Sequence, residues 1–277
     1  MRAQNRYVLM LFKPCSLSAA GMILATGLLI SIVGLVTEAR GAELPNVIER
    51  IKQSVVGVGA VQWTRRPPGK FGGTGFVVGD GRYVLTNAHV IPSELDLERK
   101  EFLAVLMPGQ NSKSQVREAQ VVKQDLTHDL ALLRINGSPL PALALGRSDK
   151  IREGELYAFT GYPIGMALGM RPVTHRGMIS AITPIALPQL SSGQLTPKLI
   201  KHLTAPFDVF QLDATAYPGN SGSPLYHMDS GEVIGIINMV FIKESKEAAL
   251  EKPSGISYAI PIDYAKNFLR GAGVSIE

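Results

Sequence analysis

Residues 74–90 read TGFVVGDGRYVLTNAHV, and this pattern is typical of a β-hairpin. Two short apolar runs, 74–78 and 82–86, flank the turn residues 79–81, which read Gly-Asp-Gly. An Asp-Gly pair between such runs is the strongest short signal for a hairpin. The stretch therefore predicts two antiparallel strands, with His89 just beyond the second.

Further short strands are predicted on both sides of this hairpin, separated by turns rich in Gly, Ser and Pro. They cover residues 55–63, 101–107, 118–125, 130–135, 156–163, 172–182, 207–216, 223–227, 231–241 and 255–261. Helices are predicted only at the ends of the body, at 44–54 and at 262–273 with a glycine cap. We interpret 64–73 as a loop and 136–155 as a crossover. Many short strands with terminal helices predict an all-β sandwich or a pair of barrels.

The bulk composition excludes several classes of protein. Apolar residues make up 45% of the 277 residues and charged residues 18%, which suits a packed core rather than disorder. The net charge is +5, but no Lys/Arg cluster has interleaved aromatics, so nucleic acid is not a predicted partner. Cys15 is the single cysteine, which rules out an intramolecular disulfide. No HExxH motif occurs, and we predict neither a metal nor a cofactor.

The first 42 residues have the composition of an export signal. Arg2, Arg6 and Lys13 precede an uncharged apolar stretch, residues 16–36. Residues 37–39 (Thr-Glu-Ala) form an imperfect cleavage site for a signal peptide. The apolar stretch is also long enough to cross a bilayer as a helix, which favours an N-terminal membrane anchor. Both alternatives place the body outside the cytoplasm.

Three segments hold the candidate chemistry: LTNAHV at 85–90, HDLALL at 128–133, and DATAYPGNSGSP at 213–224. Acyl transfer by a serine needs a base to take its proton and a carboxylate to orient that base. His89, Asp129 and Ser221 supply these groups in the chain order His, Asp, Ser, which is one of the known triad orders. Taken singly, each has an ordinary structural explanation as a core histidine, a strand-start residue or a turn residue. Their joint occurrence in this order predicts a catalytic triad.

The residues around the serine also suit an oxyanion hole. Such a hole needs two backbone N–H groups aimed at one point, and a glycine allows the necessary backbone twist. The predicted donors are the N–H groups of Gly219 and Ser221. His128 is expected to point away from Asp129 on a strand and to lie exposed. Asn87 either supports the histidine loop or simply suits a turn.

TNAHV, DLALL and GNSGSPL in this order resemble the trypsin-like (chymotrypsin-fold) serine proteases, and most closely the bacterial HtrA/Deg protease domain. The resemblance covers roughly residues 47–270 and extends to GTGFVV, LGRSDKIREGE, THRGMIS and GISYAIPID. It implies two six-stranded antiparallel β-barrels with the active site at their seam. Residues 43–277 would then be one protease domain, with barrels at about 43–150 and 151–277.

The chain departs from this family pattern in three places. No PDZ domain is expected, because the chain stops after the helix predicted at its end. Ser223 stands where the family usually has a second glycine. The segment 183–206 is long and apolar for a regulatory loop, so activation could differ from that of the family.

The resemblance also assigns a pocket for the side chain that precedes the scissile bond. Its residues would be Thr215, Ala216, Tyr217, Ile236, Ile237 and Asn238. None of them is acidic, so cleavage is expected after small or medium apolar residues rather than Lys or Arg. The family often forms trimers, and residues 44–54 are the segment that would do so here.

The leading prediction is a serine endopeptidase acting on unfolded or exposed protein segments in the bacterial envelope. It would be periplasmic, secreted, or anchored in the inner membrane through residues 16–36 and facing outward. The alternative is a catalytically latent, membrane-tethered scaffold of the same fold that binds peptides. A weaker third hypothesis is an esterase using the same triad.

Overall fold

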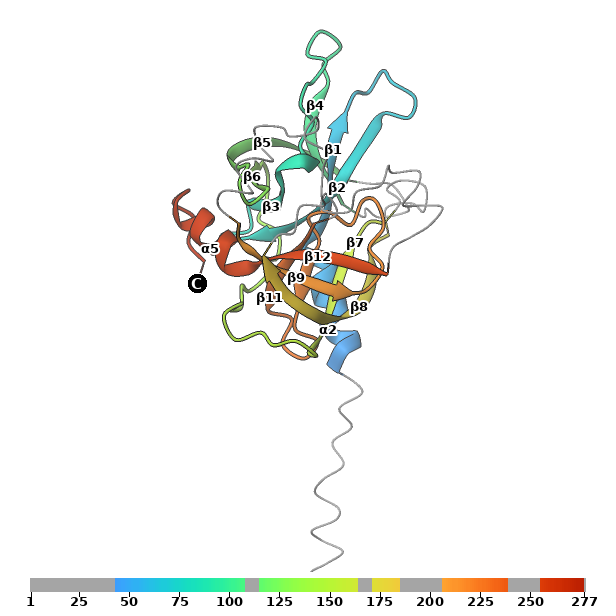
Figure 1. The fold of residues 1–277 in the computed structure, drawn as a ribbon. Coiled ribbons are helices and arrows are strands. Elements are labelled where there is room, and N and C mark those ends of the chain that lie inside the picture. Colours follow the sequence, from blue (N-terminus) through green and yellow to red (C-terminus); the bar gives the residue numbers. More distant parts are fainter. Residues whose placement is uncertain (1–42, 108–114, 164–170, 185–205, 239–254, 277) are drawn as a thin grey trace, which may run out of the picture. The chain divides into compact units, whose positions relative to one another are not determined.

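The computed structural model describes residues 43–107, 115–163, 171–184, 206–238 and 255–276. The predicted leader lies outside these ranges, as does most of segment 183–206. Figure 1 shows strands as the main element, with α2 (Glu43–Ser54) and α5 (Ile262–Arg270) near the two ends of the described chain. Within the described ranges, no helix is both long enough and apolar enough to cross a membrane.

The first six strands close into an antiparallel barrel in the order β1-β2-β3-β6-β5-β4. They are β1 (Val55–Val61), β2 (Gly69–Val78), β3 (Tyr83–Asn87), β4 (Phe102–Met107), β5 (Gln115–Asp125) and β6 (Leu130–Ile135). The predicted hairpin is present as β2 and β3, with Phe76 opposite Leu85. Closure leaves no unpaired sheet edge in this barrel.

The other six strands close a second antiparallel barrel in the order β10-β11-β12-β9-β8-β7. They are β7 (Leu156–Gly161), β8 (Val173–Pro184), β9 (Asp208–Asp213), β10 (Pro224–Tyr226), β11 (Val233–Asn238) and β12 (Ile256–Pro261). The predicted crossover, residues 136–155, runs between the barrels and contains no named strand. The expected pair of six-stranded barrels is therefore confirmed.

One stretch predicted as a loop is partly strand. The paired prolines of 64–73 do mark a hairpin tip, but Gly69–Gly73 belong to β2 and pair with β1. Glycine suits this end of β2 because its backbone runs against the segments that hold Val90 and Ser221. A Cβ on Gly73 would lie 2.9 Å from the carbonyl oxygen of Ser221. The sequence did not predict these residues as strand because glycine has a low strand propensity. Here glycine allows another part of the backbone to approach β2 closely.

Three of the four hydrophobic clusters among the described residues fill the barrels and join them. One fills the first barrel and includes Val58 and Val84, and another fills the second and includes Phe159 and Ile179. The third cluster draws on both barrels and on both helices, as Phe76, Tyr226 and Leu269 illustrate. The barrels therefore share a buried interface rather than lying side by side as independent units.

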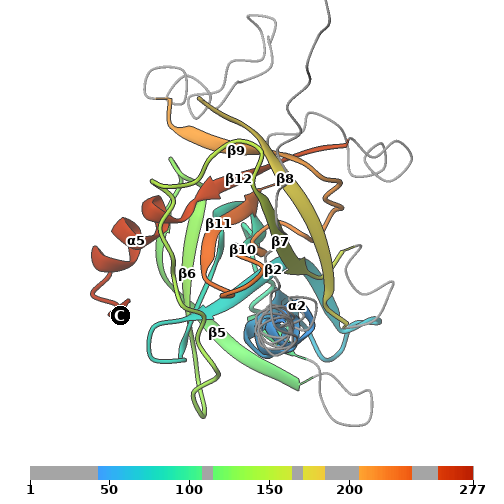
Figure 2. The same ribbon diagram turned by 90° about the horizontal axis from the view of Figure 1, so that it is seen from below.

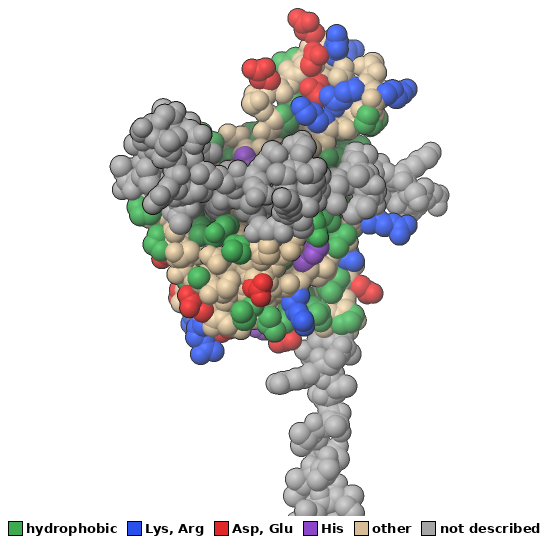
Figure 3. Space-filling view, turned by 45° about the vertical axis from the view of Figure 1, so that its right-hand side comes forward, with side chains coloured by type: hydrophobic (Ala, Val, Ile, Leu, Met, Phe, Trp, Pro, Cys, Tyr) green, Lys and Arg blue, Asp and Glu red, His purple; other side chains and the backbone are tan. Residues whose placement is uncertain are grey.

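The two helices pack on different sides of the barrels (Figure 1, Figure 2). α2 buries Val47 and Ile51, and α5 buries Ile262, Ala265 and Leu269 in the shared cluster. Gly271 caps α5 as predicted from the sequence, but in a right-handed conformation, and the left-handed glycine follows at Gly273. At the top of the view in Figure 3, acidic and basic side chains lie interspersed on the surface.

Candidate active site

His89 lies on a short 3-10 turn, Ala88–Val90, directly after β3. The turn is fastened to the start of β6, because the Ala88 N–H donates to the Asp129 carbonyl oxygen at 3.0 Å. β3 and β6 are paired strands, with Asn87 opposite Leu130. The strand pairing therefore brings His89 beside Asp129, although 40 residues separate them.

The carboxylate of Asp129 receives three hydrogen bonds. His89 approaches with its ring Nδ1, 2.6 Å from Oδ2, and with its backbone N–H, 3.0 Å from Oδ1. The third comes from the side-chain amide of Asn238, at 2.8 Å from Oδ2. Asp129 is only 3% exposed, so these donors replace the water that a free carboxylate would bind. The arrangement fixes the histidine ring by one nitrogen and leaves Nε2 for chemistry.

Burial and hydrogen bonding act in opposite directions on Asp129. Burial by itself raises the pKa of this carboxyl, but the hydrogen bonds and charge of His89 and the amide of Asn238 outweigh it. The pKa therefore lies below its ordinary value of 3.8. The group remains a carboxylate at neutral pH, as an orienting partner for an imidazole must.

Asn238 has a different position from the one expected. The resemblance assigned it to the substrate pocket, whereas its buried side chain reaches the carboxylate of Asp129 across the seam of the barrels. The sequence gives little sign of this contact, because it shows only an asparagine near the end of a strand. Asn87 also has a defined task, because its amide donates to the Asp129 carbonyl oxygen at 3.1 Å. Of the two alternatives for Asn87, support of the histidine loop is the one that the structure bears out.

Ser221 lies in the loop between β9 and β10, 4% exposed, and its backbone is held by both barrels. Its carbonyl oxygen accepts the N–H of Thr74 in β2 at 2.8 Å. The next N–H, of Gly222, donates to the carbonyl oxygen of Ile237 at 2.9 Å. Ile237 directly precedes Asn238, so a continuous set of contacts links the serine loop to Asp129.

Two glycines shape the loop around Ser221. Gly219 has φ 102° and Gly222 has φ 85°, conformations that favour glycine. A Cβ on Gly222 would lie 2.0 Å from the carbonyl oxygen of Thr74. Among the described residues, the Gly219 N–H has no backbone acceptor. That N–H is one of the two predicted oxyanion-hole donors, with that of Ser221 as the other.

Thr74 makes contacts with the serine loop that sequence reasoning missed. Its hydroxyl donates to the carbonyl oxygen of Gly219 at 2.7 Å and accepts the N–H of Tyr162 at 3.0 Å. Its own carbonyl oxygen accepts the Thr86 hydroxyl at 2.6 Å. A threonine in an apolar strand gives no sign of this role, because its partners are 12 to 145 residues away.

The remaining pocket candidates occupy different environments. Ala216 and Ile237 are buried in the core of the second barrel, and Ile236 is buried in the shared cluster. Successive residues of a strand face opposite sides, which explains the separation of Ile236 from Ile237. Thr215 and Tyr217 are half-buried.

Several buried polar side-chain atoms have no hydrogen-bond partner within the described part of the chain. His175 packs between Phe159, at 4.9 Å between ring centroids, and Tyr217, at 6.2 Å. Its Nε2 has no hydrogen-bond partner among the described residues, and burial lowers the pKa of the ring. The side chains of Asn220 and Ser223 are likewise buried without partners.

The prediction that His128 lies exposed on a strand was wrong. It lies in the turn before β6 rather than on the strand, so strand alternation does not apply to it. Its side chain is 27% exposed, and its Nδ1 lies 2.7 Å from Asp125 Oδ2. The ring also packs against Tyr264 and Phe207.

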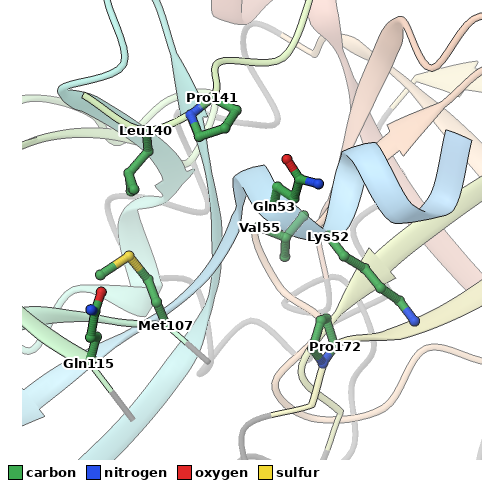
Figure 4. A pocket seen from close by; sticks show the side chains of 8 residues that line it. All are labelled: Lys52, Gln53, Val55, Met107, Gln115, Leu140, Pro141 and Pro172. Carbon is green, nitrogen blue, oxygen red and sulfur yellow. The ribbon is translucent and has the colours of Figure 1, made fainter. Parts of the chain in front are cut away.

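A separate hollow of about 530 Å³ lies between the end of α2 and the ends of β4 and β5 (Figure 4). The side chains that line it are Lys52, Gln53, Val55, Met107, Gln115, Leu140, Pro141 and Pro172. None of these is a predicted site residue, so this hollow is not part of the candidate active site. In the described part of the chain, no group of three His, Cys, Asp or Glu side chains could hold a metal ion.

Comparisons with known proteins show the family to which this fold belongs. Residues 73–236 match the family model of the trypsin-like peptidase domain. A probable periplasmic serine endoprotease, DegP-like, from Halomonas elongata is 34% identical over 211 residues, covering 72% of this chain and 36% of the relative. The mitochondrial serine protease HTRA2 of Drosophila persimilis is 36% identical over 200 residues, covering 72% and 39%.

The solved structure of an HtrA-type protease AlgW variant with a tripeptide has a TM-score of 0.58 and 27% identity. The match covers 84% of this chain and 64% of that one. The chain thus spans less than half the length of the two sequence relatives. The family match over more than half of the chain, together with both relatives and the paired barrels, places this chain in the trypsin-like peptidase family, beside the HtrA-type serine proteases.

Proposed function

We propose that this chain is a serine endopeptidase that cleaves unfolded or exposed segments of proteins. The observation that carries the proposal is the contact between His89 Nδ1 and Asp129 Oδ2 at 2.6 Å, on a family scaffold with Ser221 in the adjoining loop. The relatives are named as serine endoproteases and proteases, which supports the same reaction class here.

The proposed reaction proceeds through an acyl-enzyme. Ser221 Oγ attacks the peptide carbonyl carbon while its proton passes to His89 Nε2, and the carbonyl oxygen becomes an oxyanion. The N–H groups of Gly219 and Ser221 stabilise that oxyanion, and each such donor is worth about 10²–10³ in rate. The C–N bond breaks as His89 returns the proton to the leaving amine. A water molecule, deprotonated by His89, then attacks the acyl carbon. The bond to Ser221 Oγ breaks as His89 returns that proton to the serine, and the carboxylic acid product leaves.

The orienting role belongs to Asp129. Its carboxylate accepts from His89 Nδ1, so the imidazole keeps the tautomer whose Nε2 can take the serine proton. When the imidazole becomes charged, the buried carboxylate stabilises that charge. Asn238 supports this by holding Oδ2 from the second barrel.

The proposed preference is for small or medium apolar side chains before the scissile bond. Support comes from the residues that the resemblance assigns to the pocket, none of which is acidic. Cleavage of a peptide library should therefore occur after Ala, Val or similar residues. A dominant preference for Arg or Lys would contradict this proposal.

The proposed setting is the bacterial envelope, because relatives of this chain are named as periplasmic. Residues 1–42 would be a signal peptide or, through 16–36, a membrane anchor. Residues 43–277 would be the protease domain, with its two barrels divided near residue 150. A homotrimer formed through residues 44–54 belongs to the same proposal and can be checked by light scattering.

The test uses the full-length chain beside its Ser221→Ala variant. Each is incubated with a fluorophosphonate probe and, separately, with unfolded casein. Labelling and cleavage that the variant loses would support the endopeptidase. Labelling without casein cleavage would point to an esterase or a narrow specificity. A folded protein that does neither would contradict the proposal and favour the latent peptide-binding scaffold.

A further inference from the structure

The connection between β5 and β6 is built on the carboxylate of Asp125. Its Oδ1 accepts the backbone N–H groups of Thr127 at 2.8 Å and His128 at 3.2 Å. Its Oδ2 lies 2.7 Å from His128 Nδ1. Asp125 is also the last residue of β5 that pairs with β6, opposite Leu130. One side chain therefore organises the whole turn that ends at Asp129.

This turn leaves Asp129 in an unusual backbone conformation. Its φ is 53°, in the left-handed region, where few residues other than glycine are found. Such a conformation costs about 1–3 kcal/mol and persists only where the surroundings hold it. The carbonyl oxygen of Asp129 is held from the far side by Ala88 and Asn87. On the N-terminal side of Asp129, the turn that Asp125 fixes sets the orientation of Asp129.

The ring of His128 fixes the same turn against the C-terminal half of the chain. It stacks on Tyr264 of α5, with 4.7 Å between ring centroids and 23° between planes. It meets Phe207, which precedes β9, edge-on at 4.8 Å. Phe207 and Tyr264 also contact each other at 5.3 Å. His128 thus joins the turn of the first barrel to side chains that do not belong to that barrel.

We propose that Asp125 and His128 are positioning residues that hold the carboxylate of Asp129 at its hydrogen-bonding distance from His89. The proposal rests on the proposed triad. Neither residue touches the reacting atoms, and both act through the turn 125–129. A small displacement of Asp129 would weaken its contact with His89 Nδ1, and misplacement by about 1 Å can lower a catalytic rate about 100-fold.

The test compares three variants of the full-length chain by the rate of fluorophosphonate labelling and by casein turnover per titrated site. Asp125→Ala removes all three contacts and should label about 10- to 100-fold more slowly, with the KM for casein within about two-fold of wild type. Asp125→Asn keeps an oxygen for the two N–H groups and should recover most of the rate. Asp80→Ala is the matched control, since Asp80 Oδ1 accepts the Arg82 N–H two residues on in the same barrel. It should behave as wild type.

Counting sites by labelling to saturation separates positioning from folding. A merely structural role would reduce the number of labelled sites and leave the rate per site unchanged, which would overturn the proposal. His128→Phe keeps the ring contacts and loses only the bond to Asp125, so it gives the same test if Asp125→Ala fails to fold. It should label about 3- to 10-fold more slowly per site.

A double variant identifies the residue through which Asp125 acts. In a chain that already carries Asp129→Ala, the further change Asp125→Ala should not lower the residual labelling rate. Independent, multiplicative losses would overturn the proposal. If the wild-type chain takes no label, the proposed triad itself is refuted. If the wild type is active and Asp125→Ala is equally active, only the positioning proposal is overturned.

Discussion

Asn238 contacts Asp129 from the second barrel, because its side-chain amide donates to Asp129 Oδ2 at 2.8 Å. Asn238→Ala removes one donor to a buried carboxylate, a contact worth about 1.5–3 kcal/mol. We expect turnover of casein to fall about 10- to 100-fold, which is the same free energy expressed as a rate. Asn267→Ala, on the exposed face of α5, should leave turnover unchanged. Equal activity of both variants would remove Asn238 from the site.

His175 gives the fold a dependence on pH. Burial lowers the pKa of its ring below the ordinary 6.5, so the unfolded chain binds this proton more readily than the folded one. The free energy of unfolding contributed by the neutral ring is present above pH 6.5 and is lost as pH falls toward the lowered pKa. His175→Phe should flatten this slope in urea unfolding measured across that window, whereas His227→Phe, at an exposed position, should not. An unchanged slope in His175→Phe would contradict the assignment.

At the scale of elements, the serine loop and β2 depend on a contact between two backbones. Gly222→Ala places a Cβ 2.0 Å from the Thr74 carbonyl oxygen, in a residue with φ 85°. We expect loss of labelling by the fluorophosphonate and a drop of more than about 3 kcal/mol in the free energy of unfolding. Gly154→Ala is the matched control, with φ 91° and no atom within 4 Å of its Cβ. It should cost about 1–2 kcal/mol, from the backbone alone, and keep its activity.

Features that depend on a local sequence pattern could be predicted from the sequence, whereas features that depend on long-range contacts could not. The strands β3, β6 and β11 follow from apolar runs, and the hairpin at Gly79–Gly81 follows from its turn residues. The order of His89, Asp129 and Ser221 predicts the candidate site because it is a pattern along the chain. Asn238, Thr74 and the turn of Asp125 act through partners chosen by barrel closure, which no local pattern encodes. The mistaken placement of His128 has the same cause, since the rule of alternation holds only inside a strand.

For the whole molecule, the shared cluster predicts that the two barrels unfold together. Phe76 and Leu130 of the first barrel and Tyr226 and Ile260 of the second pack in this one cluster. The Tyr162 hydroxyl also donates to the Val55 carbonyl oxygen at 3.2 Å, from the end of β7 to the start of β1. Because each barrel completes the burial of the other, opening one should expose the other's apolar surface.

The single tryptophan makes this cooperativity measurable. Trp63 lies at the β1–β2 tip, and its ring contacts Phe102 of β4 at 6.2 Å between centroids, so its fluorescence reports on the first barrel, while far-ultraviolet circular dichroism reports on both. Ile179→Ala in the second barrel should cost about 2–5 kcal/mol and lower the Tm by roughly 5–15 °C. The shift should be equal by both probes. Ile182→Ala, a partly exposed position on the same strand, should change the Tm little. If Trp63 kept the wild-type transition in Ile179→Ala, the barrels would be independent, and a site assembled at their seam would have to form after each had folded.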